Sequence, residues 1–217
     1  MGIKENLEKI KRELPSNVTL VAATKTRSVE EIKIVIEAGI TIIGENYIQE
    51  AEKKFNILKE KAKFHCIGHL PTNKIKKAVE LFDMIETVDS IKIAREIDKK
   101  CKDIGKVMPI LIEINSGKEP NKDGVMPENV ESLIKQISIL PNIQVKGLMT
   151  MAPYFDDPEK DRPYFKLTKG LFDKIKTLNI PNIDMKVLSM GMSDSYKIAI
   201  EEGANMVRIG TKIFGPR

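Results

Sequence analysis

Short apolar runs alternate with longer amphipathic segments along most of the chain. The apolar runs are four to seven residues long and rich in Val and Ile, as 108–114 shows most clearly. Runs of this kind predict parallel strands that are buried on both faces. We expect strands at 18–23, 40–43, 64–67, 84–88, 108–114, 143–149, 184–188 and 205–209.

Helical periodicity fills the intervals between these runs. Apolar residues recur at spacings of four, three and four along 3–14, and 28–31 (Ser-Val-Glu-Glu) has the pattern of a capping box. Later helices are expected at 193–202 and, in a short final piece, at 212–215. Eight β/α units after an extra N-terminal helix favour a (β/α)8 barrel, with a doubly wound open sheet as the alternative. No Pro- or Ser-rich linker divides the chain, so we expect one domain over 1–217.

Charge and cysteine content narrow the class of protein. The formal net charge of +5 comes mainly from 30 lysines, which interleave with acids, and this favours a solvated surface over nucleic-acid binding. Cys66 and Cys101 lie far apart within apolar stretches, which is typical of a reduced cytoplasmic protein. The N-terminus has no apolar signal core and no 18 apolar residues run consecutively, so we expect neither secretion nor membrane insertion.

The first expected strand leads to a lysine. Lys25 follows seven uncharged residues, 18–24, and active-site groups in β/α barrels lie at the C-terminal ends of strands. A cation nearby, from Arg27 or Arg208, would favour the neutral amine, which is the form that attacks an aldehyde. Because the chain has 30 lysines, position alone does not separate Lys25 from a solvated lysine.

Small and hydroxylated residues follow the last two strands, where barrels frequently bind phosphate. Gly191 and Gly210 allow the backbone to approach a ligand closely. Ser193 and Thr211 offer hydroxyl groups at the expected starts of helices. The two loops together indicate a phosphate site, although ordinary helix caps with glycine turns would explain each loop by itself.

Arg208 and the two histidines are the other polar groups among apolar neighbours. A charge inside a strand is costly unless it is paired or bound to a ligand, so Arg208 either contacts a ligand or forms an interior salt bridge with Glu113. His65 and His69 have no acidic ligand nearby in the sequence. We therefore expect no metal site, and an inward-facing polar role for His65.

Several short motifs, distributed over nearly the whole chain, resemble a known family. They are Ala23-Thr-Lys-Thr26, Gly44-Glu-Asn-Tyr47, His65-Cys-Ile-Gly68 with Asn73-Lys74, Gly147-Leu-Met-Thr150, Leu188-Ser-Met-Gly-Met-Ser-Asp194 and Val207-Arg-Ile-Gly-Thr211. In this order they resemble the pyridoxal phosphate homeostasis protein family, which is related to the N-terminal barrel of alanine racemase.

The resemblance implies a cofactor and the residues that hold it. Lys25 matches the lysine that carries pyridoxal 5′-phosphate as an aldimine, and Arg208 matches the arginine that faces the pyridine nitrogen. Pro71 stands where the family usually has Gln, so the resemblance assigns no role to that loop. The remaining implied residues, which form the phosphate cup or line the ring pocket, are Asn46, Met190, Ser193, Gly210 and Thr211.

The implied chemistry favours binding over turnover. An arginine at the ring nitrogen leaves the pyridine unprotonated and makes the cofactor a weaker electron sink. In alanine racemase the second base is a tyrosine from another domain, and we expect no such domain here. We therefore expect a monomeric, non-enzymatic protein that stores or buffers pyridoxal phosphate, or delivers it to apoenzymes that depend on it. A single-domain amino-acid racemase and a barrel aldolase that uses Lys25 on sugar phosphates are the alternatives.

Overall fold

Eight parallel strands form a closed barrel in the computed structural model, which describes residues 2–216. The strands follow one another around the barrel in chain order, and β1 pairs with both β2 and β8. This closure confirms the predicted (β/α)8 barrel and excludes the open sheet. The strands are β1 (Thr19–Ala23), β2 (Ile42–Glu45), β3 (Lys63–Cys66), β4 (Met84–Val88), β5 (Met108–Ile114), β6 (Ile143–Thr150), β7 (Ile183–Ser189) and β8 (Met206–Ile209).

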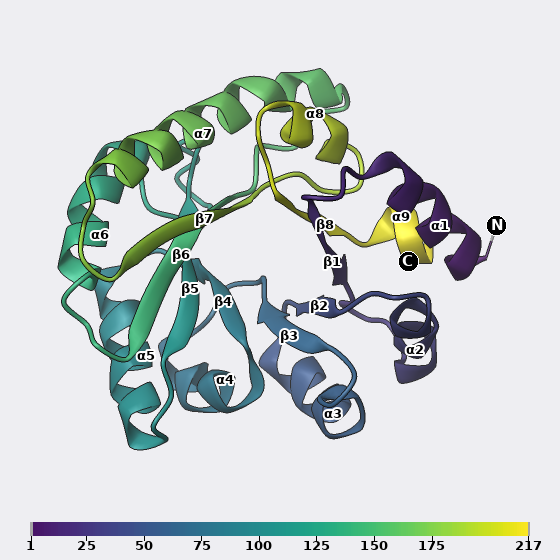
Figure 1. Cartoon of the computed structure of the whole chain (residues 1–217), viewed down its shortest axis with the longest axis horizontal. Helices are drawn as coiled ribbons and strands as arrows, with labels where there is room; N and C mark the ends of the chain where they lie inside the picture. The colour runs from purple at the N-terminus through teal and green to yellow at the C-terminus, as the bar shows by residue number, and fades with distance from the viewer. Residues whose placement is uncertain (1, 217) are drawn as a thin grey trace.

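Helices surround the strands, and the first helix, α1, packs beside the last, α9 (Figure 1). The extra N-terminal helix is therefore confirmed. Within residues 2–216, no helix combines the length and apolar character needed to cross a membrane. The helices are α1 (Ile3–Glu13), α2 (Val29–Glu37), α3 (Ile48–Leu58), α4 (Ile75–Leu81), α5 (Ile91–Asp103), α6 (Val130–Ile137), α7 (Arg162–Thr177), α8 (Tyr196–Glu201) and α9 (Thr211–Phe214), with 3-10 turns at Thr72–Lys74, Pro127–Asn129 and Pro158–Asp161.

Local hydrogen bonds explain where two of these helices begin. At α2, Glu31 N donates to Ser28 Oγ (3.2 Å) and Ser28 N donates to Glu31 Oε2 (2.8 Å), which confirms the predicted capping box. The expected start of a helix at Ser193 is wrong. The N–H groups of Ser195 and Tyr196 both donate to the carbonyl of Met192, so this segment forms a turn and α8 begins only at Tyr196.

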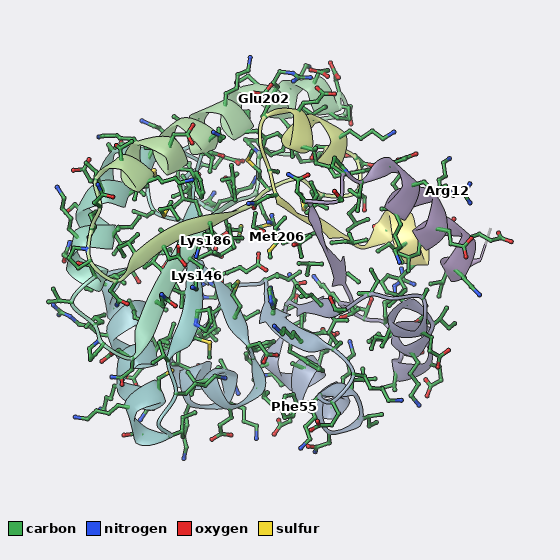
Figure 2. All side chains as sticks on the ribbon, in the orientation of Figure 1. Arg12, Phe55, Lys146, Lys186, Glu202 and Met206 are labelled. Atoms are coloured by element: carbon green, nitrogen blue, oxygen red, sulfur yellow. The ribbon has the colours of Figure 1, made fainter. Side chains whose placement is uncertain are left out.

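The barrel separates two apolar cores. The larger lies between the strands and the surrounding helices, whereas a small inner cluster contains Val21, Ile67 and Met206. Figure 2 shows Met206 within the ring of strands and Phe55 outside it on α3. Residues two apart on a strand share a face, so Val21 and Met206 show which face of β1 and of β8 points into the barrel. Arg208 follows Met206 on that face, toward the C-terminal end of β8.

Candidate functional site

The C-terminal ends of neighbouring strands bring the predicted residues together at one rim of the barrel. Ala22 pairs with Ile209 of β8, and Ala23 pairs with Gly44 of β2. Lys25, Asn46 and Gly210 therefore follow the ends of three adjacent parallel strands. This rim is where (β/α)8 barrels carry their functional groups.

The Lys25 amine lies at the mouth of the barrel, against an aromatic ring. Lys25 is half-buried, and its Nζ is 4.9 Å from the centroid of the Tyr47 ring, which is a cation–π distance. Arg27 is engaged elsewhere, because it donates to the carbonyl of Gly215 (2.6 Å) and to Glu31 Oε1 (3.3 Å). The Arg27 guanidinium is therefore directed toward α2 and the C-terminal residues.

A buried ion pair anchors the residue before Lys25. The side chains of Lys54 on α3 and Glu45 on β2 are nearly inaccessible to solvent, and Nζ lies 2.7 Å from Oε1. Thr24 contacts both partners: its hydroxyl donates to Glu45 Oε1 (2.5 Å), and its carbonyl accepts from Lys54 Nζ (2.8 Å). Burial raises the pKa of Glu45, and hydrogen bonding to Lys54 opposes that rise. The Oε2 atom of Glu45 has no partner within the described chain.

The residue after Lys25 is held by the same helix. Thr26 has a φ of 66°, a backbone region that non-glycine residues seldom adopt. Its N–H donates to Glu50 Oε2 (2.7 Å), which in turn lies 3.5 Å from Lys54 Nζ. Lys54 and Glu50 of α3 therefore hold the backbone on the two sides of Lys25.

Replacing Lys54 by Met is expected to reduce the free energy of unfolding by about 3 kcal/mol at neutral pH, because Glu45 loses its buried cation. The pKa of Glu45 is already raised in the folded state, so its neutral form stabilises the fold at acid pH and that contribution is lost as the pH rises through the folded-state pKa. In urea titrations, the loss of unfolding free energy in Lys54→Met relative to wild type should thus be smaller at about pH 4 than at about pH 7.5.

Lys53 provides the matched control for this experiment. It neighbours Lys54 on α3 but is exposed, so Lys53→Met should change stability by less than about 0.5 kcal/mol. Equal losses in the two variants would show that the buried ion pair contributes nothing specific.

Two glycines allow the loops after β7 and β8 to pack closely. Gly191 has a φ of +91°, and a Cβ there would lie 2.6 Å from the Cβ of Ala199. Its carbonyl accepts from the N–H of Arg208 (3.1 Å), which joins the β7 loop to β8. At Gly210, a Cβ would lie 3.1 Å from the carbonyl oxygen of Ala23, at the end of β1. The two loops thus pack closely, one against α8 and the other against the end of β1 before Lys25, and are called the cradle below.

The hydroxyl groups of this cradle come from both loops. Ser193 Oγ accepts from the N–H of Lys212 (3.2 Å), so it ties the β7 loop to the first residues of α9. Thr211 opens α9 and is exposed. Backbone N–H groups, two hydroxyls and a glycine-lined approach form the kind of donor set that holds a phosphate group.

Asn46 and Met190 lie in different surroundings. Asn46 is half-buried and lines a groove of about 350 Å³ together with Tyr47, His69 and Pro71. Met190 is fully buried, and its side chain belongs to the core between the barrel and the helices. The structure therefore brings Asn46 to the rim, whereas Met190 reaches it only through its backbone in the β7 loop.

Arg208 lies inside the barrel and is 4% exposed. Its two terminal nitrogens donate to Ser189 Oγ (2.6 Å) and to the carbonyl oxygen of Thr150 (2.9 Å). In the described part of the chain no ion pair joins it to Glu113, so the interior salt bridge considered for these two residues is not formed. Burial lowers the pKa of Arg208, and the nearby carboxylates of Glu86 and Glu113 oppose this.

Glu86 and His65 continue this network across the barrel. Ser189 Oγ donates to Glu86 Oε2 (2.7 Å), and His65 Nδ1 donates to Glu86 Oε1 (2.7 Å). Burial disfavours the charge on Glu86, yet the His65 ring and the Arg208 guanidinium hold its pKa below the usual value. The inward-facing polar role predicted for His65 is confirmed.

Glu113 is the second interior carboxyl group, and it behaves differently. Burial and the nearby Asp123 carboxylate raise its pKa to about 8, so it is protonated at neutral pH.

No cluster of three or more His, Cys, Asp or Glu side chains suited to a metal ion occurs between residues 2 and 216.

Sequence reasoning missed Lys54, Glu45, Glu86 and Ser189. Glu86 carried a usable signal, because it is a charged residue inside the apolar run 84–88, as Arg208 is inside its own strand. Lys54 carried none, since nothing in the pattern distinguishes it from the other lysines of the Lys/Glu-rich helices.

Comparison with known proteins places the chain among its relatives. The alanine racemase N-terminal domain family matches residues 2–217. The pyridoxal phosphate homeostasis protein of Aquifex aeolicus is 42% identical over 199 residues, which cover 91% of this chain and 86% of the relative. That of Pasteurella multocida is 36% identical over 230 residues and covers 100% of this chain and 98% of the relative.

Solved structures agree with this assignment. PipY of Synechococcus elongatus PCC7942, solved with pyridoxal phosphate bound, has a TM-score of 0.90 and 31% identity, covering 98% of this chain and 100% of PipY. Alanine racemase of Clostridium difficile 630 has a TM-score of 0.84 at 18% identity over 100% of this chain and 60% of the racemase, which shows a shared fold. The chain therefore belongs to the alanine racemase N-terminal domain family and, within it, to the pyridoxal phosphate homeostasis proteins.

Proposed function

We propose that this protein binds pyridoxal 5′-phosphate through an imine with Lys25 and serves as a cytoplasmic store, buffer or carrier of the cofactor. The observation that carries the proposal is a lysine amine against the Tyr47 ring at the same rim as the two glycine-containing loops that present Ser193 and Thr211. The printed names of the relatives and the cofactor bound to PipY support it. The recipients would be apoenzymes that depend on pyridoxal phosphate.

The residues present fit this cofactor. When bound, it supplies an aldehyde carbon for the Lys25 amine. Ser193, Gly210 and Thr211 would hold the phosphate, and Arg208 would present its N–H groups to the ring. Asn46 would border the ring from β2, and the backbone of Met190 would line the opposite loop.

Binding without turnover is favoured by the groups around Lys25. Arg208 would donate a hydrogen bond to the pyridine nitrogen without giving up its proton, because a guanidinium is far more basic than a pyridine, so the ring would stay unprotonated and a weak electron sink. Tyr47, which lies against Lys25, presents its ring face to the amine. We accordingly expect no exchange of the α-proton when the loaded protein is incubated with a broad panel of amino acids in deuterated water. Exchange that disappears in Lys25→Ala would instead support the racemase alternative.

Phosphate recognition can be tested by comparing pyridoxal phosphate with pyridoxal. Ser193→Ala is expected to weaken binding of the phosphorylated form about tenfold, because one hydroxyl donor is lost. Binding of pyridoxal should stay the same, since it has no phosphate to place in the cradle. Equilibrium dialysis of both ligands against wild type and variant measures this. Equal losses for both ligands, or equal wild-type affinity for them, would contradict a phosphate role for this loop.

A further inference from the structure

Arg208 is held at two of its nitrogens by groups from different strands. Ser189, the last residue of β7, accepts from one nitrogen at 2.6 Å, and the carbonyl of Thr150, the last residue of β6, accepts from the other at 2.9 Å. A guanidinium has five N–H groups, so others remain free to face a ligand. The orientation of these remaining groups depends on what fixes Ser189.

The number of available protons determines which group donates and which accepts in each hydrogen bond of this network. Ser189 has a single hydroxyl proton, and Arg208 can only donate. Ser189 must therefore accept from Arg208 and donate to Glu86, whose Oε1 also accepts from His65. The lowered pKa of Glu86 agrees with this assignment, because an ionised carboxylate only accepts. The bonds from Arg208 on β8 through Ser189 on β7, and from His65 on β3, thus converge on the carboxylate of Glu86 on β4.

We propose that Glu86 and Ser189 are positioning residues for Arg208, which hold its guanidinium in one orientation and balance its charge below the cofactor site. This inference rests on the proposed function, because it concerns the cofactor that Arg208 would face. Neither residue touches the ligand in this account. They act through Arg208, and so they set the electrostatic environment of the imine on Lys25.

The expected effect follows from the charges inside the barrel. Arg208 is a cation and Glu86 an anion, whereas the Glu113 carboxyl is neutral below its pKa of about 8. The other ionisable groups near these carboxyls are His65 and Cys66, on β3, and Asp89 and Asp123, on loops. Replacing Glu86 by Gln leaves the guanidinium unbalanced, and an unbalanced cation disfavours the protonated, positively charged imine. The imine pKa should therefore fall.

The test is a pH titration of the visible absorbance of the loaded protein. In Glu86→Gln the pKa of the imine is expected to fall by about one unit relative to wild type. Glu86→Asp, which keeps the charge, should restore it to within about 0.3 units. Glu113→Gln is the matched control: it makes the same chemical change on the neighbouring strand β5, but below the Glu113 pKa of about 8 it removes no charge, so over that pH range its titration curve should follow that of wild type.

A second variant keeps the test decisive if Glu86→Gln does not fold. Ser189→Ala leaves the pair of His65 and Glu86 intact and breaks only the link to Arg208, so a smaller fall of the imine pKa is expected. An unchanged imine pKa in both variants, or an equal fall in Glu113→Gln, would overturn the inference. Absence of any imine absorbance in wild-type protein would instead refute the proposed function.

Discussion

A Gly147→Ala variant is expected to lose more than about 4 kcal/mol of unfolding free energy, which is an exceptional loss for a single methyl group. Gly147 has a φ of +154°, and a Cβ there would lie 1.7 Å from the carbonyl oxygen of Val187. Rigid backbone occupies that space, so β6 and β7 must separate. The pairing of β6 with β7 also shifts register at this point and then aligns Met149 with Ser189. The substitution therefore disturbs the strand ends that hold Arg208.

Gly170 offers a control with the same chemical change. It lies exposed on α7, and a Cβ there would meet no atom within 4 Å. Gly170→Ala is expected to stabilise the protein by up to about 1 kcal/mol, because alanine is the better helix former. Urea unfolding measures both variants. If the two alanines had similar effects, the tight contact between β6 and β7 would not be a constraint on the fold.

Lys25→Ala is expected to weaken the retention of pyridoxal phosphate at least about 100-fold, since only non-covalent contacts remain. Lys25→Arg is the informative companion, because it keeps a cation near Tyr47 but has no amine that forms an imine. Both variants should be colourless after dialysis, while wild type retains its visible absorbance. A coloured Lys25→Arg protein would show that another lysine carries the cofactor.

The barrel was predictable from the sequence because each strand is a local apolar run. The runs 84–88 and 108–114 coincide with β4 and β5. The second strand was displaced: it was expected at 40–43 and forms at Ile42–Glu45, since the main-chain ladder with β3 continues through Gly44 and Glu45. Polar residues and glycine can pair in a ladder as well as apolar ones, so the apolar pattern alone does not locate such a strand end.

The rim of the site was predictable, but its supporting contacts were not. Lys25 and Gly210 could be placed from their positions after strands, which is a local property. Glu86 acts on Ser189, 103 residues later, and the two meet only because the barrel interior faces both. Lys54 likewise depends on how α3 packs against the end of β1. Contacts of this kind depend on tertiary geometry, which a pattern of residue types does not contain.

Borohydride reduction of the protein loaded with pyridoxal phosphate, followed by peptide mapping, shows directly whether Lys25 forms the imine. Reduction converts an imine into a stable bond, so the modified lysine can be located by mass. We expect one modified residue per chain, Lys25, among the 30 lysines. Modification of a different lysine, scattered modification of surface lysines, or no modification at all would contradict this expectation.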